Sequence, residues 1–111
     1  MSMSQEFQNL LEEKGTVLKQ LGLSEIALER IDALLAVQLF RKTSIPILGG
    51  DVYFKHGEGV EIAYANWHSD QRAGEGRDQF VMRSCLETEN YIRNFPPSDA
   101  VPLFVLVPAT K

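Results

Sequence analysis

The fold of this chain is decided by the stretch Ile45-Pro-Ile-Leu-Gly-Gly-Asp-Val-Tyr-Phe-Lys-His-Gly-Glu-Gly-Val-Glu-Ile-Ala-Tyr-Ala-Asn-Trp67. Apolar and polar side chains alternate along both of its halves, and a glycine-rich segment separates the halves. The apolar members of the alternation are Val52, Phe54, Val60, Ile62 and Tyr64. This pattern predicts a β-hairpin that ends at the only tryptophan of the chain.

The expected register of the hairpin follows from the faces of its strands. Directly opposed residues share a face, so the apolar residues meet only if the turn holds an odd number of residues. A turn over residues 57–59 meets this condition and gives Gly59 the position that favours a left-handed backbone. The predicted pairs are Phe54 with Ile62, Val52 with Tyr64, Lys55 with Glu61, and Tyr53 with Ala63. Val52, Phe54, Ile62 and Tyr64 would then form the buried face.

Helical patterns flank the hairpin on both sides. Ser4 to Lys14 predicts a helix with Ser4 as its N-cap, and Ile31 to Lys42 predicts another. The second has apolar residues on more than one face, so we expect it to be the most buried helix. Asp78 to Phe95 predicts a third, with apolar residues at steps of three and four.

One further strand completes the predicted fold. The apolar run Leu103 to Val107, between two prolines, indicates a strand covered on both faces. Within Thr16 to Leu28, the apolar residues from Val17 to Leu23 fit a short helical turn, and Glu25 to Leu28 fits either the start of a helix or a brief extended segment. Because the order of elements is not βαβ, we predict an α+β fold: a small antiparallel or mixed sheet of at least three strands packed with about three helices.

Composition limits the class of protein. With 111 residues, 44% of them hydrophobic and 23% charged, the chain is expected to form one soluble domain over residues 1–111. No apolar run approaches the roughly 18 to 20 residues of a membrane span, and the N-terminus lacks the features of a secretory signal. We therefore expect a cytoplasmic location. The single cysteine, Cys85, excludes an internal disulfide and a cysteine-built zinc site.

The charge of the chain bears on its partners. The formal net charge is -4, and the lysines and arginines are scattered. Nucleic-acid binding draws its affinity from clustered basic residues, so this class of partner is not expected. Mild acidity also suits a protein that docks on a basic partner.

No set of side chains in the sequence makes a catalytic centre. Cys85 lies on the apolar stripe of the third helix, as a core residue would. His56 and His68 are separated by the length of a strand, which disfavours a shared metal site or an acid/base pair. Asp51 and Glu58 lie at opposite ends of one strand. We therefore expect no enzyme activity, no cofactor and no metal.

The pair Gly49-Gly50 lies at the start of the first strand of the predicted hairpin. A strand follows it, and neither a Lys-Ser/Thr pair nor a further spaced glycine is present, so it does not form a phosphate-binding loop. We expect a bulge or bend that re-aims the strand.

One face of the predicted hairpin has the composition of an interface. In the expected register, Tyr53 shares a face with Asp51 and Glu61, and Trp67 continues the side of the alanines. Aromatic residues among charges are typical of protein interfaces. The alternative is that the first helix or the polar loop from Trp67 to Gly76 folds over this face and buries Trp67.

The chain resembles the immunity protein 40 family of bacterial polymorphic toxin systems over about residues 20 to 95. The resemblance is carried by Ser24-Glu-Ile-Ala-Leu28, Asp32-Ala-Leu34, the stretch Ile45 to Tyr53, Asn66-Trp67 and Ser84. It implies a cytoplasmic antidote that binds and neutralises a cognate toxin without catalysis.

The resemblance and the predicted surface together favour occlusion of a toxin's active site. Two other classes stay open: a small-ligand-binding or regulatory domain with an aromatic sheet face, and a small enzyme that uses Asp51 and His68. The sequence leaves the oligomeric state open. The residues expected to bind the partner are Asp51, Tyr53, Glu58, Glu61, Trp67, His68 and Asp70.

Overall fold

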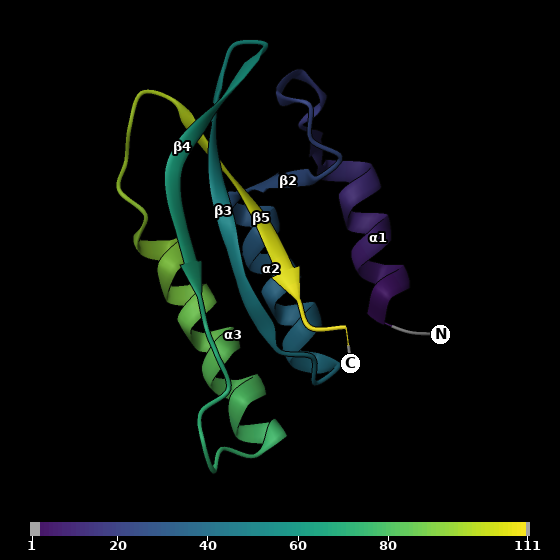
Figure 1. Cartoon of the computed structure of the whole chain (residues 1–111). Coiled ribbons are helices and arrows are strands. Elements are labelled where there is room, and N and C mark those ends of the chain that lie inside the picture. Colours follow the sequence, from purple (N-terminus) through teal and green to yellow (C-terminus); the bar gives the residue numbers. More distant parts are fainter. Residues whose placement is uncertain (1–2, 111) are drawn as a thin grey trace.

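The computed structural model describes residues 3–110. Within that range the chain forms five strands, three α-helices and one 3-10 helix (Figure 1). In order they are α1 (Met3–Lys14), β1 (Thr16–Val17), η1 (Lys19–Leu21), β2 (Ile26–Glu29), α2 (Arg30–Lys42), β3 (Ile47–His56), β4 (Gly59–His68), α3 (Arg77–Asn94) and β5 (Val101–Pro108). The sheet order is β1-β2-β5-β3-β4, and all the described pairings are antiparallel. The predicted α+β class is confirmed.

The three predicted helices are present, with small shifts at their ends. α1 begins at Met3, one residue before the expected cap Ser4, whose side chain lies outside the described part of the structure. α2 buries one stripe of side chains, formed by Ala33, Ala36, Val37 and Phe40. Ile31 and Leu35 are 77% and 52% exposed, so the apolar residues of α2 outside that stripe lie at the surface.

The sheet separates two apolar clusters. On one face, Val52, Phe104 and Leu106 join the main core with α1, α2 and α3. On the other face, Leu103 and Val105 join a smaller cluster with the segment around η1. The last strand is therefore covered on both faces, as predicted. The ambiguous region of residues 16–28 contains both candidate structures, because two short strands flank η1.

Two polar contacts hold α3 in place, one to the sheet and one to the start of α2. The Ser84 hydroxyl, fully buried, accepts a hydrogen bond from the Ile47 backbone N–H at 3.1 Å. The Arg30 guanidinium donates to the carbonyl oxygens of Ile92 and Phe95, and so satisfies acceptors at the C-terminal end of the helix. Cys85, beside Ser84, is fully buried, which confirms its assignment to the core, and burial raises the pKa of its thiol.

The predicted register of the hairpin is wrong. Opposite His56 lies Gly59, so the turn holds two residues, and Gly57 supplies the positive φ of 55°. Phe54 faces Glu61 and Lys55 faces Val60 in place of the predicted partners. Further along, the pairing shifts between Tyr53–Ile62 and Val52–Ala65. Two residues of β4, Ala63 and Tyr64, are thus inserted as a bulge, with Tyr64 at a φ of 56°.

The face of β4 that we predicted to be buried is consequently exposed, and its other face packs against the helices. Ala63, Ala65 and Trp67 pack against the main core, while Ile62 and Tyr64 are 45% and 89% exposed. In β3 the prediction holds better, because Val52 is 1% exposed and Phe54 is half-buried. The reversal follows from the two-residue turn, and the small alanine side chains on the layer of β4 that faces the helices leave room for the indole ring of Trp67 beside α3.

Gly49 and Gly50 form the expected irregularity in β3. The pairing of β3 with β5 shifts between Ile47 and Gly49, and Gly49 has a φ of 150°. Gly50 lies directly opposite Trp67. A Cβ at Gly50 would collide with the carbonyl oxygen of Val105 and would lie 2.7 Å from Cζ2 of Trp67. Gly50 is therefore the position where the indole ring crosses the backbone.

We expect Gly50→Ala to lower the free energy of unfolding by about 1 to 3 kcal/mol, as overpacking does in a close-packed core. Denaturant unfolding followed by Trp67 fluorescence measures this loss. Gly59→Ala is the matched control, because a Cβ there meets only the His56 carbonyl oxygen at 3.5 Å, an ordinary contact. Equal stability of the two variants would contradict the proposed steric role of Gly50.

Candidate functional site

The two predicted aromatic anchors lie on opposite faces of the sheet. The Trp67 ring stacks on Tyr91 of α3 with centroids 4.7 Å apart, and its Nε1 donates to the Thr88 hydroxyl at 2.9 Å. Tyr53 is 7% exposed and packs in the smaller cluster with Leu18. The predicted shared surface of Tyr53 and Trp67 is therefore wrong. The open alternative, burial of Trp67 under a covering element, is closer to the structure, although α3 provides the cover.

The remaining predicted binding residues follow β4 and its two ends. Asp51 lies opposite Asn66 on the face away from the helices. Glu58 is exposed in the turn, and Glu61 contacts His56, with 3.0 Å between Oε2 and Nε2.

His68 ends the strand, and its Nε2 lies 3.8 Å from Oδ2 of Asp70. Five of the predicted residues thus border one strand at the edge of the sheet.

The two ends of the stretch from Ile45 to Trp67 lie side by side in the structure. Residues 48–51 and 66–68, with Val107, line a shallow hollow of about 230 Å³. Gly50 and Trp67 have a structural role there, because the ring needs the space that a Cβ would fill. Asp51, Asn66 and His68 belong to the polar lining of the hollow. This stretch therefore contains residues that are needed for packing and, beside them, an accessible polar surface.

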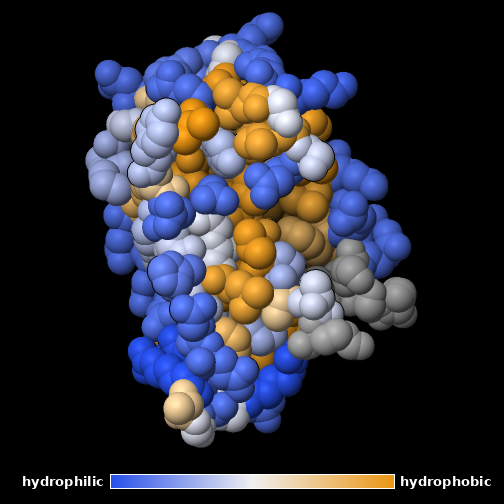
Figure 2. Space-filling model, in the orientation of Figure 1, coloured by the Kyte–Doolittle hydropathy of each residue, from blue (hydrophilic) through white to orange (hydrophobic). Residues whose placement is uncertain are grey.

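Sequence reasoning missed the most exposed aromatic residue of the described chain. Tyr64 is 89% exposed, and its neighbour Ile62 is 45% exposed, although the alternation predicted both to be buried. Figure 2 shows the sheet face that carries no α-helix, with apolar surface gathered along its middle and polar residues at its sides. Val101 and Val107 of β5 contribute to the exposed apolar surface of the sheet. A bulge in β4 exposes Tyr64, and no sequence signal marks it.

The loop after β4 is tied to α3 by Arg83. The guanidinium donates to both carboxylate oxygens of Glu75, at 2.8 and 2.7 Å, and to the Asp70 carbonyl oxygen at 2.6 Å. It also donates to Glu87 at 3.2 Å, and Glu87 accepts a hydrogen bond from the buried Ser69 hydroxyl at 2.6 Å. The predicted exposed loop is largely exposed, but this network holds its two ends.

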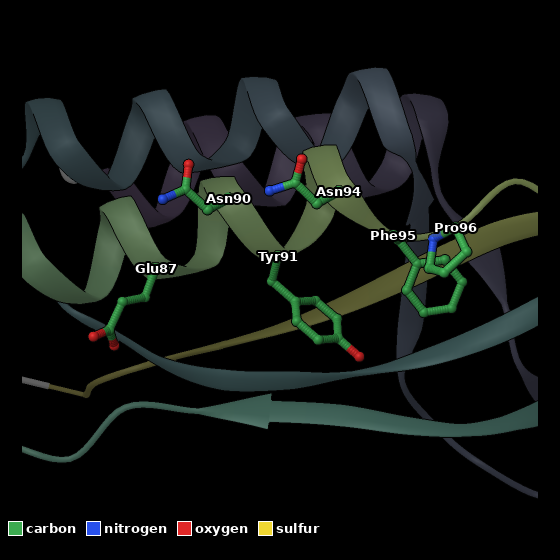
Figure 3. Close-up of a pocket in the computed structure, with 6 residues that line it drawn as sticks. All are labelled: Glu87, Asn90, Tyr91, Asn94, Phe95 and Pro96. Carbon is green, nitrogen blue, oxygen red and sulfur yellow. The ribbon is translucent and has the colours of Figure 1, made fainter.

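A larger hollow of about 450 Å³ follows the flank of α3 (Figure 3). Tyr91 and Phe95 point from the helix toward the strands, and Asn90 and Asn94 lie one helical turn apart. Tyr91 also carries the Trp67 stack, so this hollow is separated from β4 by one aromatic ring. Its lining residues are Glu87, Asn90, Tyr91, Asn94, Phe95 and Pro96.

Among residues 3–110, no group of three or more His, Cys, Asp and Glu side chains is placed to hold a metal ion. None of the helices in that range is long and apolar enough to cross a membrane.

The comparisons with known proteins identify the class and then the family. The class is that of the immunity proteins, inhibitors that are typically not enzymes. The sequence model of immunity protein 40 matches residues 17–108, which include every strand except the first residue of β1, together with α2 and α3. The chain belongs to the immunity protein 40 family. No curated protein and no solved structure matched it.

The Arg83 network predicts a loss of stability in acid. Hydrogen bonds from Arg83 and from the Arg72 backbone lower the pKa of Glu75 from 4.5 to about 2. Because the folded pKa is the lower one, the interaction stabilises the protein fully above about pH 4.5, and this stabilisation is lost as the pH falls toward 2.

We expect Glu75→Gln to lower the melting temperature at pH 7 and to leave it unchanged near pH 2, as measured by circular dichroism. Glu12→Gln is the control, because Glu12 is exposed on α1 and makes no ion pair within the described chain. A loss at pH 7 that persists undiminished near pH 2 would assign the effect to something other than the Glu75 charge.

Proposed function

We propose that this protein neutralises a cognate bacterial toxin by binding it through β4 and the surfaces beside that strand, so that the toxin's active site is occluded. Family membership over residues 17–108 carries the proposal, because immunity proteins have toxins as partners. Neutralisation by binding requires no catalytic group on this chain. The protein would act in the cytoplasm, where the toxin must be stopped.

The exposed residues of β4 support this choice of surface. Tyr64 is a large aromatic side chain at 89% exposure, and Ile62 lies beside it at 45%. Aromatic side chains that become desolvated on binding contribute much of the energy of protein interfaces. In the proposal Tyr64 replaces Tyr53 and Trp67 as the anchor, because those two residues are needed inside the fold.

Acidic residues surround these apolar side chains. Asp51, Glu58, Glu61 and Asp70 lie along β4 or at its ends, and the formal net charge of the chain is -4. Charges at the rim of an interface mainly raise the association rate and select the partner. This arrangement fits a basic surface on the toxin. A nucleic-acid partner does not fit it, since phosphates would be repelled.

The ligand-binding alternative required a concave pocket formed by Tyr53 and Trp67. These residues belong to different apolar clusters on opposite faces of the sheet. The hollow beside Tyr91 is within the usual range of small-molecule pockets by volume. It lacks the enclosed form of such pockets, since it lies open along the helix flank (Figure 3). Toxin binding is therefore the better supported function.

Coexpression with the product of the adjoining toxin gene tests the proposal. We expect the wild-type protein to restore growth and to copurify with the toxin. Tyr64→Ala should weaken binding by about 30-fold, as an interface hot spot of roughly 2 kcal/mol does. Asp70→Lys should slow association, with a smaller effect at high salt. Isothermal titration and stopped-flow kinetics measure these two changes.

Leu86→Ala serves as the control for surface truncation, because Leu86 is 52% exposed on α3 and is not among the residues that line the two hollows described above. We expect it to bind with unchanged affinity. Trp67→Ala is not a suitable probe, because loss of the Tyr91 stack and of the Thr88 hydrogen bond would destabilise the fold. Unchanged affinity and protection in both Tyr64→Ala and Asp70→Lys would refute the proposed surface.

A further inference from the structure

The outer edge of β4 has the hydrogen-bonding groups of an unpaired strand. β4 is last in the sheet order, and no strand within residues 3–110 pairs with its outer side. In an antiparallel hairpin, every second residue directs its backbone N–H and C=O away from the neighbouring strand. Counted from the closing pair His56–Gly59, these residues are Val60 and Ile62 on the turn side of the bulge.

One of these positions is already covered and the other is not. The Val60 N–H donates to Oε1 of Gln20 at 3.1 Å, and Nε2 of Gln20 donates to the Glu58 carbonyl oxygen at 2.8 Å. This side chain from η1 shields the turn end of the strand. At Ile62, by contrast, no described side chain is bonded to the backbone of the edge.

The strand has few of the features that protect natural sheet edges. Such edges usually carry lysine, proline or inward-pointing charges, or are very short. β4 has ten residues, without proline or lysine, and Glu61 is its only acidic residue. Apart from the Gln20 side chain at the turn end, the protective feature is the bulge at residues 63–64, where Tyr64 is exposed. An accessible edge of this kind is a template for another strand.

The hollow on α3 lies where an added strand would need space. Neighbouring strands are about 4.8 Å apart, so a strand beside β4 would run close to the Tyr91 ring that stacks on Trp67. Side chains on its helix-facing side could then enter the hollow of about 450 Å³. Asn90 and Asn94 are exposed at this hollow, and their side-chain amides make no hydrogen bond within the described chain, which leaves them available.

We propose that an extended segment of the toxin adds as a sixth strand to the outer edge of β4, with an apolar side chain in the hollow beside Tyr91 and basic side chains near Glu61 and Asp70. This inference deepens the proposed function and rests on it. Backbone hydrogen bonds would supply affinity, and the hollow and the carboxylates would select the segment. The acidic border favours a basic toxin segment as the occupant.

Residue-resolved hydrogen exchange by NMR tests the strand addition. The probe is the catalytically inactivated toxin domain from the adjoining gene, and the free protein is the reference. We expect the Ile62 amide to exchange quickly in the free protein and at least about tenfold more slowly in the complex, as a backbone hydrogen bond implies. The Val60 amide, held by Gln20, should change much less.

Two substitutions at one position separate the backbone from the side chain. Ile62→Pro removes the outward N–H, and edge strands tolerate proline at such a position. Ile62→Thr retains the N–H and shortens the apolar side chain. We expect the proline variant to bind at least about fivefold more weakly than the threonine variant, the effect of roughly one hydrogen bond. If the proline variant fails to fold, the exchange experiment on the wild-type protein decides alone.

The outcomes distinguish the inference from the function on which it rests. A complex that forms while Ile62 exchange stays unchanged would overturn the strand addition and leave toxin binding in place. Absence of both growth rescue and complex formation would overturn the proposed function and the strand addition with it. Protection of Ile62 in the free protein that grows with its concentration would show that a second copy occupies the edge, and would also overturn the proposal.

Discussion

The packing of the Trp67 ring across the backbone of Gly50 is the constraint on which the rest of this structure depends. The ring reaches this place because Gly50 has no side chain, and it is held there by the Tyr91 stack and the Thr88 hydroxyl. Once Trp67 points toward the helices, the paired residues of β4 near it must follow the same alternation. Ala65 therefore faces the core, and the outward face of the edge strand is set.

The helix α3 fixes the positions of several elements around that contact. The sheet lies between the helices on one face and the segment around η1 on the other. The buried face of α3 holds β3 through Ser84 and β4 through Thr88, two short hydroxyl side chains that satisfy donors from the sheet. Its exposed flank holds the loop that precedes the helix through Arg83. Because one rigid helix bears all three contacts, the edge of β4, the loop and the hollow beside Tyr91 have fixed relative positions. Such preorganisation lowers the entropy cost of binding.

Most of the fold was predictable because strong periodic patterns determine it. The helices, the hairpin and the strand after Pro102 were identified from the spacing of apolar residues, and the bend at Gly49-Gly50 from glycine. The register of the hairpin was not predictable, because turns of two and of three residues both put a glycine where the backbone can adopt a positive φ. In the structure Gly57, and not Gly59, adopts it. The assignment of faces then failed at Ala63, which packs against the core because a helix packed close to a strand favours small side chains.

The candidate site was predicted only in part, for a related reason. The acidic residues Glu58, Glu61 and Asp70 are exposed as expected, since isolated carboxylates avoid burial. The aromatic anchors were misassigned because an aromatic residue has equal reason to be in a core or at an interface, and only tertiary contacts decide between them. The exposure of Tyr64 was not predicted because Tyr64 lies in a bulge of β4. The bulge changes the direction of the side chain, but the alternation of residue types in the sequence stays the same.

Some of the residues that carry the family resemblance stabilise the fold, whereas others are exposed, and this difference bears on how an immunity protein of this fold binds its partner. Gly50, Trp67 and Ser84 are used by the fold, so substitutions there would alter every surface at once. Tyr64 and Ile62 make no comparable contribution to the core, and Asn66 faces away from it. Selectivity for a particular toxin is therefore best carried by these outward positions of β4, because they can change without loss of the scaffold. An edge strand adds a further advantage, since its backbone supplies hydrogen bonds whatever its side chains are.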